Sequence, residues 1–123
     1  MKLSKIIDLI NGELLSSIDP NKIEIGGAMG ADLMSDVLTS VQPEAVLLTG
    51  LCNPQVLRTA QIADIRAIIF VRCKNPTPEM LEISKTENIP LIKTKFGLFT
   101  ASGILFNAGL PNYELEADDD CPY

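Results

Sequence analysis

The apolar positions of this chain fall into two patterns, short runs that are apolar throughout and longer stretches in which apolar residues recur at helical spacing. Leu3, Ile6 and Ile10 recur in this way, and the pair Asn11–Gly12 that follows is typical of a helix C-terminus. Further along, the pattern predicts a short strand over residues 13–17, a second strand over residues 22–28, and a helix over about residues 31–38.

From residue 45 onward the sequence repeats one unit with a spacing of 22 residues. Residues 45–54 and residues 67–76 each contain a continuously apolar run, a polar turn and an Asn-Pro pair. Such a run is typical of a strand that is covered on both faces, as in a parallel sheet. The Asn-Pro pair supplies a helix N-cap and a proline at the first helical position. We therefore expect helices over residues 55–64 and 78–87, and a third unit with a strand at 91–92 and a helix over about 99–107.

Strand–turn–helix units of this size predict an α/β fold, a three-layer sandwich around a mainly parallel sheet of about five strands with right-handed crossovers. We expect residues 1–110 to form a single domain. Residues 111–123 contain five of the 16 acidic residues and none of the 10 basic ones, so they carry most of the net charge of −6. This composition predicts a disordered tail, with docking to a partner or cation binding as the alternative.

Absences from the composition exclude several functions. The chain has no histidine, which excludes Ser-His-Asp and Cys-His nucleophile activation and histidine-ligated zinc. It has no tryptophan, few aromatic residues and a negative charge, which argues against nucleic-acid binding. The longest apolar run, residues 67–71, is far shorter than the about 20 residues of a membrane span. Since no secretory signal pattern is present, a cytoplasmic location without membrane contact is expected.

The three cysteines, Cys52, Cys73 and Cys121, are too far apart to form a Cys-x-x-Cys pair. An iron–sulfur cluster that is held by one chain normally needs four cysteine ligands. We therefore expect reduced, buried structural thiols, no metal site and no bound cofactor. Two alternatives remain open: two chains could share a cluster, and the start of a helix after Cys52 could lower the pKa of its thiol.

The candidate ligand site lies in the segments that follow the strands, because open α/β sheets bind ligands outside the carboxyl ends of their strands. Glycines before a helix let backbone N–H groups approach an anion. The candidate ligand-binding residues are Gly26, Gly27, Met29, Gly30, Thr49, Gly50, Asn53, Thr94 and Lys95. The glycines could equally serve turn geometry and helix packing, the threonines could be caps, and the lysine could be solvated. The sequence has no Gly-x-Gly-x-x-Gly or P-loop motif and no catalytic residue is predicted, so an enzyme is not expected.

Several stretches of the chain resemble the DRTGG domain family. They are residues 27–38, 48–50, 53–54, 63–70 and 89–92, with Thr94 and Phe99, and they span most of residues 1–110. The five letters of the family name do not occur here as a contiguous string. The resemblance implies a fold like the N-terminal domain of HPr kinase/phosphatase, in a small regulatory module that accompanies catalytic domains and has no established activity of its own.

Two functions are compatible with these observations. The first is a non-enzymatic regulatory module that senses a small anionic ligand, such as a nucleotide or a phosphometabolite, and acts as a homodimer. The second is an interaction or scaffold protein for a redox enzyme, since the resemblance includes stand-alone proteins encoded near iron-only hydrogenase genes. The dimer is expected to form through the predicted C-terminal helix, whose apolar residues, among them Phe99 and Phe106, cover more of its surface than one sheet contact needs.

Overall fold

A single sheet contains the strands in the part of the chain that the structure describes, residues 1–39, 42–114 and 116. In this computed structural model the strand order is β1-β5-β4-β3-β2. The strands are β1 (Glu13–Leu14), β2 (Gly27–Gly30), β3 (Ala45–Thr49), β4 (Ala67–Phe70) and β5 (Leu91–Lys93). Strands β2 to β5 are parallel to their neighbours, whereas β1 pairs antiparallel with β5 at the edge opposite β2.

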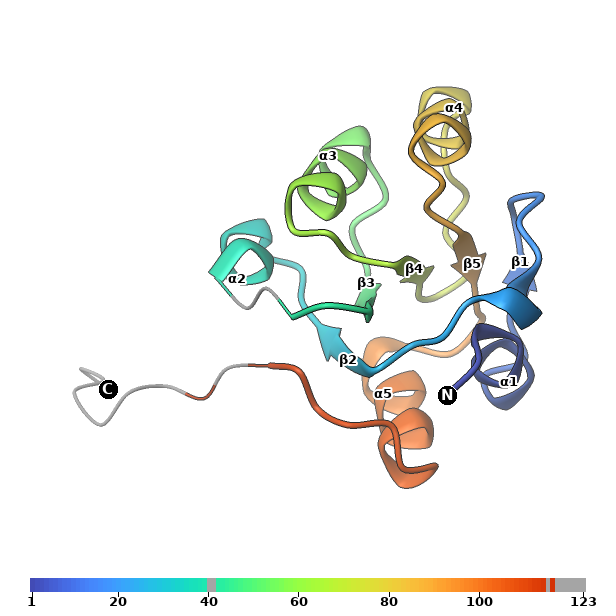
Figure 1. Cartoon of the computed structure of the whole chain (residues 1–123), viewed down its shortest axis with the longest axis vertical. Helices are drawn as coiled ribbons and strands as arrows, with labels where there is room; N and C mark the ends of the chain where they lie inside the picture. The colour runs from blue at the N-terminus through green and yellow to red at the C-terminus, as the bar shows by residue number, and fades with distance from the viewer. Residues whose placement is uncertain (40–41, 115, 117–123) are drawn as a thin grey trace.

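Helices cover both faces of this sheet (Figure 1). One face carries α2 (Met34–Thr39), α3 (Pro54–Ile62) and α4 (Pro78–Glu87), and the other carries α1 (Leu3–Leu9) and α5 (Leu98–Asn107). A short 3-10 helix, η1 (Pro20–Lys22), precedes β2. The predicted α/β sandwich with a mainly parallel sheet of about five strands is therefore confirmed. In the described part of the chain no helix is long and apolar enough to cross a membrane.

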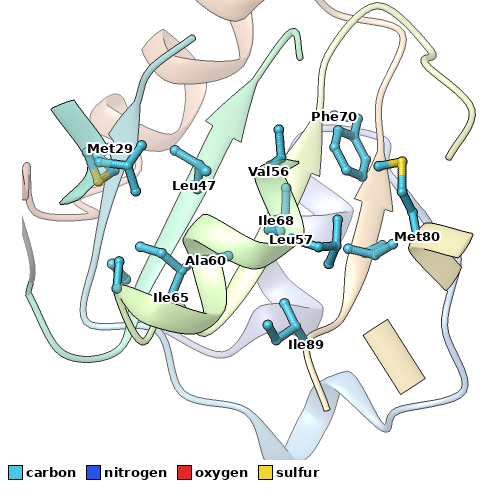
Figure 2. Close-up of a cluster of buried hydrophobic side chains, with 14 residues drawn as sticks. Met29, Leu47, Val56, Leu57, Ala60, Ile65, Ile68, Phe70, Met80 and Ile89 are labelled. Atoms are coloured by element: carbon cyan, nitrogen blue, oxygen red, sulfur yellow. The ribbon is translucent and has the colours of Figure 1, made fainter. Parts of the chain in front are cut away.

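Each face of the sheet has its own hydrophobic core, and successive residues of one strand belong to different cores. Leu47 and Ile68 pack with α3 and α4 in the cluster that Figure 2 shows, whereas Val46 and Ile69 pack with α1 and α5. This is why β3 and β4 are apolar at nearly every position, since both of their faces are buried. Burial of one side chain of this size contributes about 1.5–3 kcal/mol to stability.

Strand β2 lies later in the chain than the apolar pattern predicts. The prediction of a strand over residues 22–28 is confirmed only at residues 27 and 28. Ile23 and Ile25 instead pair with the first residues of the chain through two backbone hydrogen bonds of 2.9 and 2.8 Å. The glycine segment instead forms β2, which pairs in parallel register with β3. Glycine is disfavoured in strands, so no strong local signal marks this strand and its pairing depends on the tertiary structure.

The C-terminal segment, residues 110–114, lies along the free edge of β2. The Ala28 N–H donates to the Pro111 carbonyl and the Tyr113 N–H donates to the Ala28 carbonyl, each at 2.9 Å. The folded body therefore extends past the predicted boundary at residue 110, because β2 would otherwise present unpaired backbone groups there. The prediction of disorder for residues 115 and 117–123 lies outside the described residues.

Candidate functional site

A groove runs between strand β2, helix α5 and the C-terminal segment, and we call it the β2–α5 groove. Its volume is about 340 Å³, which falls in the range of small-molecule sites. Its strand side is formed by Ala28, Met29, Gly30 and Leu48, and its helix side by Phe99, Ser102, Gly103, Leu105 and Phe106. It is the candidate ligand site of this chain.

A glycine lies on each of the two sides of the groove, Gly30 on the strand side and Gly103 on the helix side. A Cβ placed on Gly103 would meet nothing within 4 Å, and this glycine is exposed. A Cβ on Gly30 would lie 3.3 Å from Leu98 Cδ1 and 3.6 Å from the Ser102 hydroxyl oxygen. Gly103 therefore leaves open space, whereas the space in front of Gly30 is already taken by Leu98 and Ser102.

Two phenylalanines on the helix side of the groove are nearly unburied. Phe99 is 94% exposed and Phe106 is 70% exposed, although both contribute to the lining. One exposed phenylalanine is unremarkable, but these two lie on a helix without any charged residue, with Gly103 between them. Together the three residues form an apolar stripe, and such a stripe is typical of a contact surface.

The polar groups of the groove come mainly from the C-terminal segment. A Glu114 carboxylate oxygen accepts a hydrogen bond from the Gly30 N–H at 2.9 Å, and the Asn112 side-chain oxygen accepts one from the Glu114 N–H at 2.8 Å. The Ser102 oxygen and a Glu114 carboxylate oxygen both lie within 4 Å of the point that a Cβ on Gly30 would occupy. Glu114 is the one charged residue among those that line the groove, so the groove is acidic.

Gly26 and Gly27, which are predicted to bind a ligand, lie instead against the side chain of Tyr113. A Cβ on Gly26 would be 2.5 Å from the Tyr113 hydroxyl oxygen, and a Cβ on Gly27 would be 2.5 Å from the ring carbon Cδ1. The Tyr113 ring also packs against the core on the α2–α4 face. The two glycines therefore make room for a ring of the chain itself, and they do not line the β2–α5 groove.

A second polar cluster lies at the carboxyl ends of β2 and β3, around the carboxylate of Asp32. The same carboxylate oxygen accepts two hydrogen bonds, one from the Gly50 N–H at 2.7 Å and one from the Thr49 hydroxyl at 3.1 Å. Backbone donors at this edge of the sheet are those expected to hold an external anion. Here the Gly50 N–H and the Thr49 hydroxyl, which belong to predicted ligand-binding residues, both donate to the carboxylate of Asp32 in the same chain.

The remaining predicted ligand residues lie apart from the groove. The Asn53 side chain caps α3 by accepting a hydrogen bond from the Val56 N–H at 3.2 Å. The buried Thr94 hydroxyl donates to the Ile10 carbonyl at 2.7 Å, and Lys95 is exposed. Of the predicted ligand residues, the groove brings together Met29 and Gly30.

Sequence reasoning does not find the other groups that shape the groove, Ser102, Gly103, Asn112 and Glu114. A signal for the first two is present, because a pair of small residues interrupts a charge-free apolar helix between its phenylalanines. No local signal marks Glu114, whose hydrogen-bond partner Gly30 is 84 residues away in the chain.

The cysteines in the described residues are less buried than expected. Cys52 is partly buried and Cys73 is exposed, so the expectation of a buried structural thiol is wrong for Cys73. Burial raises the pKa of the Cys52 thiol above its ordinary value, although the charge of Lys74 acts in the opposite direction. Cys121 lies outside the described residues, and among those described no group of three or more Cys, Asp or Glu side chains could hold a metal ion.

Comparison with known proteins shows a likeness of fold. No protein-family model matches the sequence, and no curated protein matches it either. The structure is similar to the crystal structure of the CBS and DRTGG domains of the regulatory region of Clostridium perfringens pyrophosphatase, complexed with the activator diadenosine tetraphosphate. The TM-score is 0.74 at 21% sequence identity, and the match covers 96% of this chain and 51% of that one. The chain thus has a DRTGG/CBS-like fold and spans about half the length of that regulatory region.

Proposed function

We propose that this chain is a non-enzymatic regulatory module that senses a small nucleotide or phosphometabolite in the β2–α5 groove. The observation that carries the proposal is the groove itself, an apolar hollow of about 340 Å³. A few polar groups converge in it, the Gly30 N–H, the Ser102 hydroxyl and the Glu114 carboxylate. An apolar hollow with a few convergent polar groups is typical of a small-molecule site.

Two further observations support a sensing role. The fold is similar to a regulatory region whose structure contains a nucleotide activator, and the resemblance to the DRTGG family implies a regulatory module as well. The side chains of Asn112 and Glu114 already accept hydrogen bonds from backbone N–H groups. These hydrogen bonds fix the positions of both side chains beside the groove.

Thermal-shift measurements on the full chain test this function, with nucleotides, diadenosine tetraphosphate and phosphometabolites as probes. A ligand of the folded state stabilises it by RT ln(1 + [L]/Kd), so Tm should rise with ligand concentration. Gly103→Leu should remove the rise, because the added side chain fills the groove where no neighbour stands in its way. Thr100→Leu places a leucine at an exposed position of α5 outside the groove and should keep the rise. A Tm that no probe raises, or an unchanged rise in Gly103→Leu, contradicts the proposal.

We also propose that the module is a homodimer that associates through helix α5. The stripe of Phe99, Gly103 and Phe106 is exposed, apolar and free of charge. A two-fold axis near Gly103 places Phe99 of one copy near Phe106 of the other, because a symmetric contact pairs the same patch on both subunits. Phe99, Gly103 and Phe106 also line the groove, so such a contact would lie next to the proposed ligand site.

Light scattering on the full chain at micromolar concentration tests the dimer. The double variant Phe99→Ser/Phe106→Ser should be monomeric. Ile62→Ser removes an apolar residue that is 76% exposed on α3, on the other face of the sheet, and it should leave the mass unchanged. A monomeric wild-type chain contradicts the dimer. If no probe raises Tm in that case, the stripe favours the alternative function, docking to a partner enzyme.

A further inference from the structure

Resting on the proposed ligand site, we infer that the β2–α5 groove recognises the base of an amino-substituted purine and that Glu114 selects for the amino group. The groove then holds the uncharged part of a nucleotide, and the phosphates remain outside it. This reverses the expectation from the sequence, in which glycine N–H groups hold a phosphate.

The charge of the groove argues against a phosphate inside it. Among the lining residues Glu114 alone is charged, and it is acidic. The Gly30 N–H already donates to the Glu114 carboxylate at 2.9 Å. A phosphate would therefore lose its water and face a like charge without gaining a cation in the lining.

The walls of the groove suit a flat aromatic ring. The strand side at Ala28 and Gly30 is little more than backbone, and the helix side contains Phe99 and Phe106. Aromatic side chains stack on nucleobases of every kind, because each base has a π-face. A base between these two walls buries its apolar faces and keeps its polar edge free for the C-terminal segment.

The polar groups of the groove match the edge of an aminopurine. A carboxylate offers about four acceptor sites, and the Gly30 N–H uses one of those of Glu114. The others can accept N–H groups from an exocyclic amine and, in guanine, from the adjacent ring nitrogen. The Ser102 hydroxyl, which converges with Glu114 above Gly30, can donate to a ring nitrogen or accept from an amine. A base without the amino group offers this carboxylate fewer N–H donors, and that loss is the source of selectivity.

Isothermal titration calorimetry of the full chain with adenosine, guanosine and inosine tests the inference. Inosine has a keto oxygen in place of the amino group of adenosine and a hydrogen in place of that of guanosine, so it is the matched control for both. Adenosine or guanosine should bind at least about tenfold more tightly than inosine, as expected for one hydrogen bond to a charged group. Pyrophosphate, which has no base, should not displace the bound nucleoside.

Two variants separate recognition by Glu114 from a general effect of charge. Glu114→Gln keeps an oxygen for the Gly30 N–H and should reduce the discrimination against inosine to within about threefold. Glu116→Gln removes the same charge from an exposed neighbour outside the groove and should keep the discrimination.

Equal binding of the three nucleosides, displacement by pyrophosphate, or full discrimination in Glu114→Gln overturns the inference. If nucleotides still raise Tm in a way that Gly103→Leu removes, the sensing function stands and the assignment of the base fails. If no nucleoside, nucleotide or phosphometabolite binds, both fail.

Discussion

The ring of Tyr113 lies so close to the backbone of Gly27 that a Cβ at position 27 would be 2.5 Å from the ring carbon Cδ1. The contact fastens the C-terminal segment to strand β2, beside the parallel bridge between Ala28 and Asn112. Because that segment forms one wall of the β2–α5 groove, the contact also maintains the candidate ligand site.

Gly27→Ala should lower the free energy of unfolding by about 1–3 kcal/mol, because the methyl group overlaps the Tyr113 ring. Tyr113→Ala should lower it by about 1–2 kcal/mol through the loss of a partly buried ring. In the double variant Gly27→Ala/Tyr113→Ala the methyl group has room. The free energy of unfolding that the double variant loses should therefore be smaller than the sum of the losses in the two single variants. Urea unfolding of the three variants measures this coupling, and strictly additive losses would show that the ring does not lie on Gly27.

The Asp32 carboxylate should stabilise the carboxyl ends of β2 and β3. Asp32→Ala should lower the free energy of unfolding by about 1 kcal/mol, because the Gly50 N–H and the Thr49 hydroxyl lose a charged acceptor that is itself exposed. Asp8→Ala removes an exposed carboxylate from α1 and should change it by less than about 0.5 kcal/mol. Urea unfolding compares the two variants, and equal effects would argue against a role for this cluster.

Two glycines at the C-terminal end of the fold should respond to alanine in opposite ways. Gly103→Ala should stabilise the chain by about 0.5–1 kcal/mol, because position 103 is helical and a Cβ meets nothing within 4 Å. Gly109→Ala should destabilise it by about 1 kcal/mol, because Gly109 has a φ of +96° just after the end of α5. Thermal unfolding of both variants in the Phe99→Ser/Phe106→Ser background, in which the proposed dimer does not form, gives the signs. Destabilisation by Gly103→Ala in that background would contradict the open space at position 103.

The thiol of Cys52 should make stability depend on pH at the alkaline end. Burial raises its pKa in the folded chain, so the unfolded chain, with an ordinary thiol pKa of about 8.5, loses the proton first. The contribution of Cys52 is therefore full below that pH and is lost as the pH rises through the raised pKa of the folded state. Between about pH 7 and pH 10, urea unfolding should show a steeper loss for the wild type and Cys73→Ala than for Cys52→Ala. Identical slopes in all three chains would contradict the raised pKa.

The sequence by itself determined the inner strands and the helices that follow them, because their signals are local. Strands β3 and β4 are apolar in successive residues, and this pattern requires burial on both faces wherever the strands lie. Asn53 caps α3 as its Asn-Pro pair predicts, whereas α4 begins later than its own pair, at Pro78 after the cap residue Thr77. Both caps act on a backbone N–H three residues ahead, so the stereochemistry of a few neighbouring residues specifies them.

Only the tertiary structure decided the position of β2 and the groove beside it. The glycines of β2 have little strand preference of their own, and they form a strand because β3 offers them a parallel hydrogen-bonding partner. The hollow beside them exists because β2, α5 and the C-terminal segment, which are far apart in the sequence, come together around it. Its acidic wall exists because Glu114 hydrogen bonds to a residue 84 positions earlier in the chain. A hydrogen bond across such a separation has no trace in local propensity, because it forms only after the sheet has brought the two segments together.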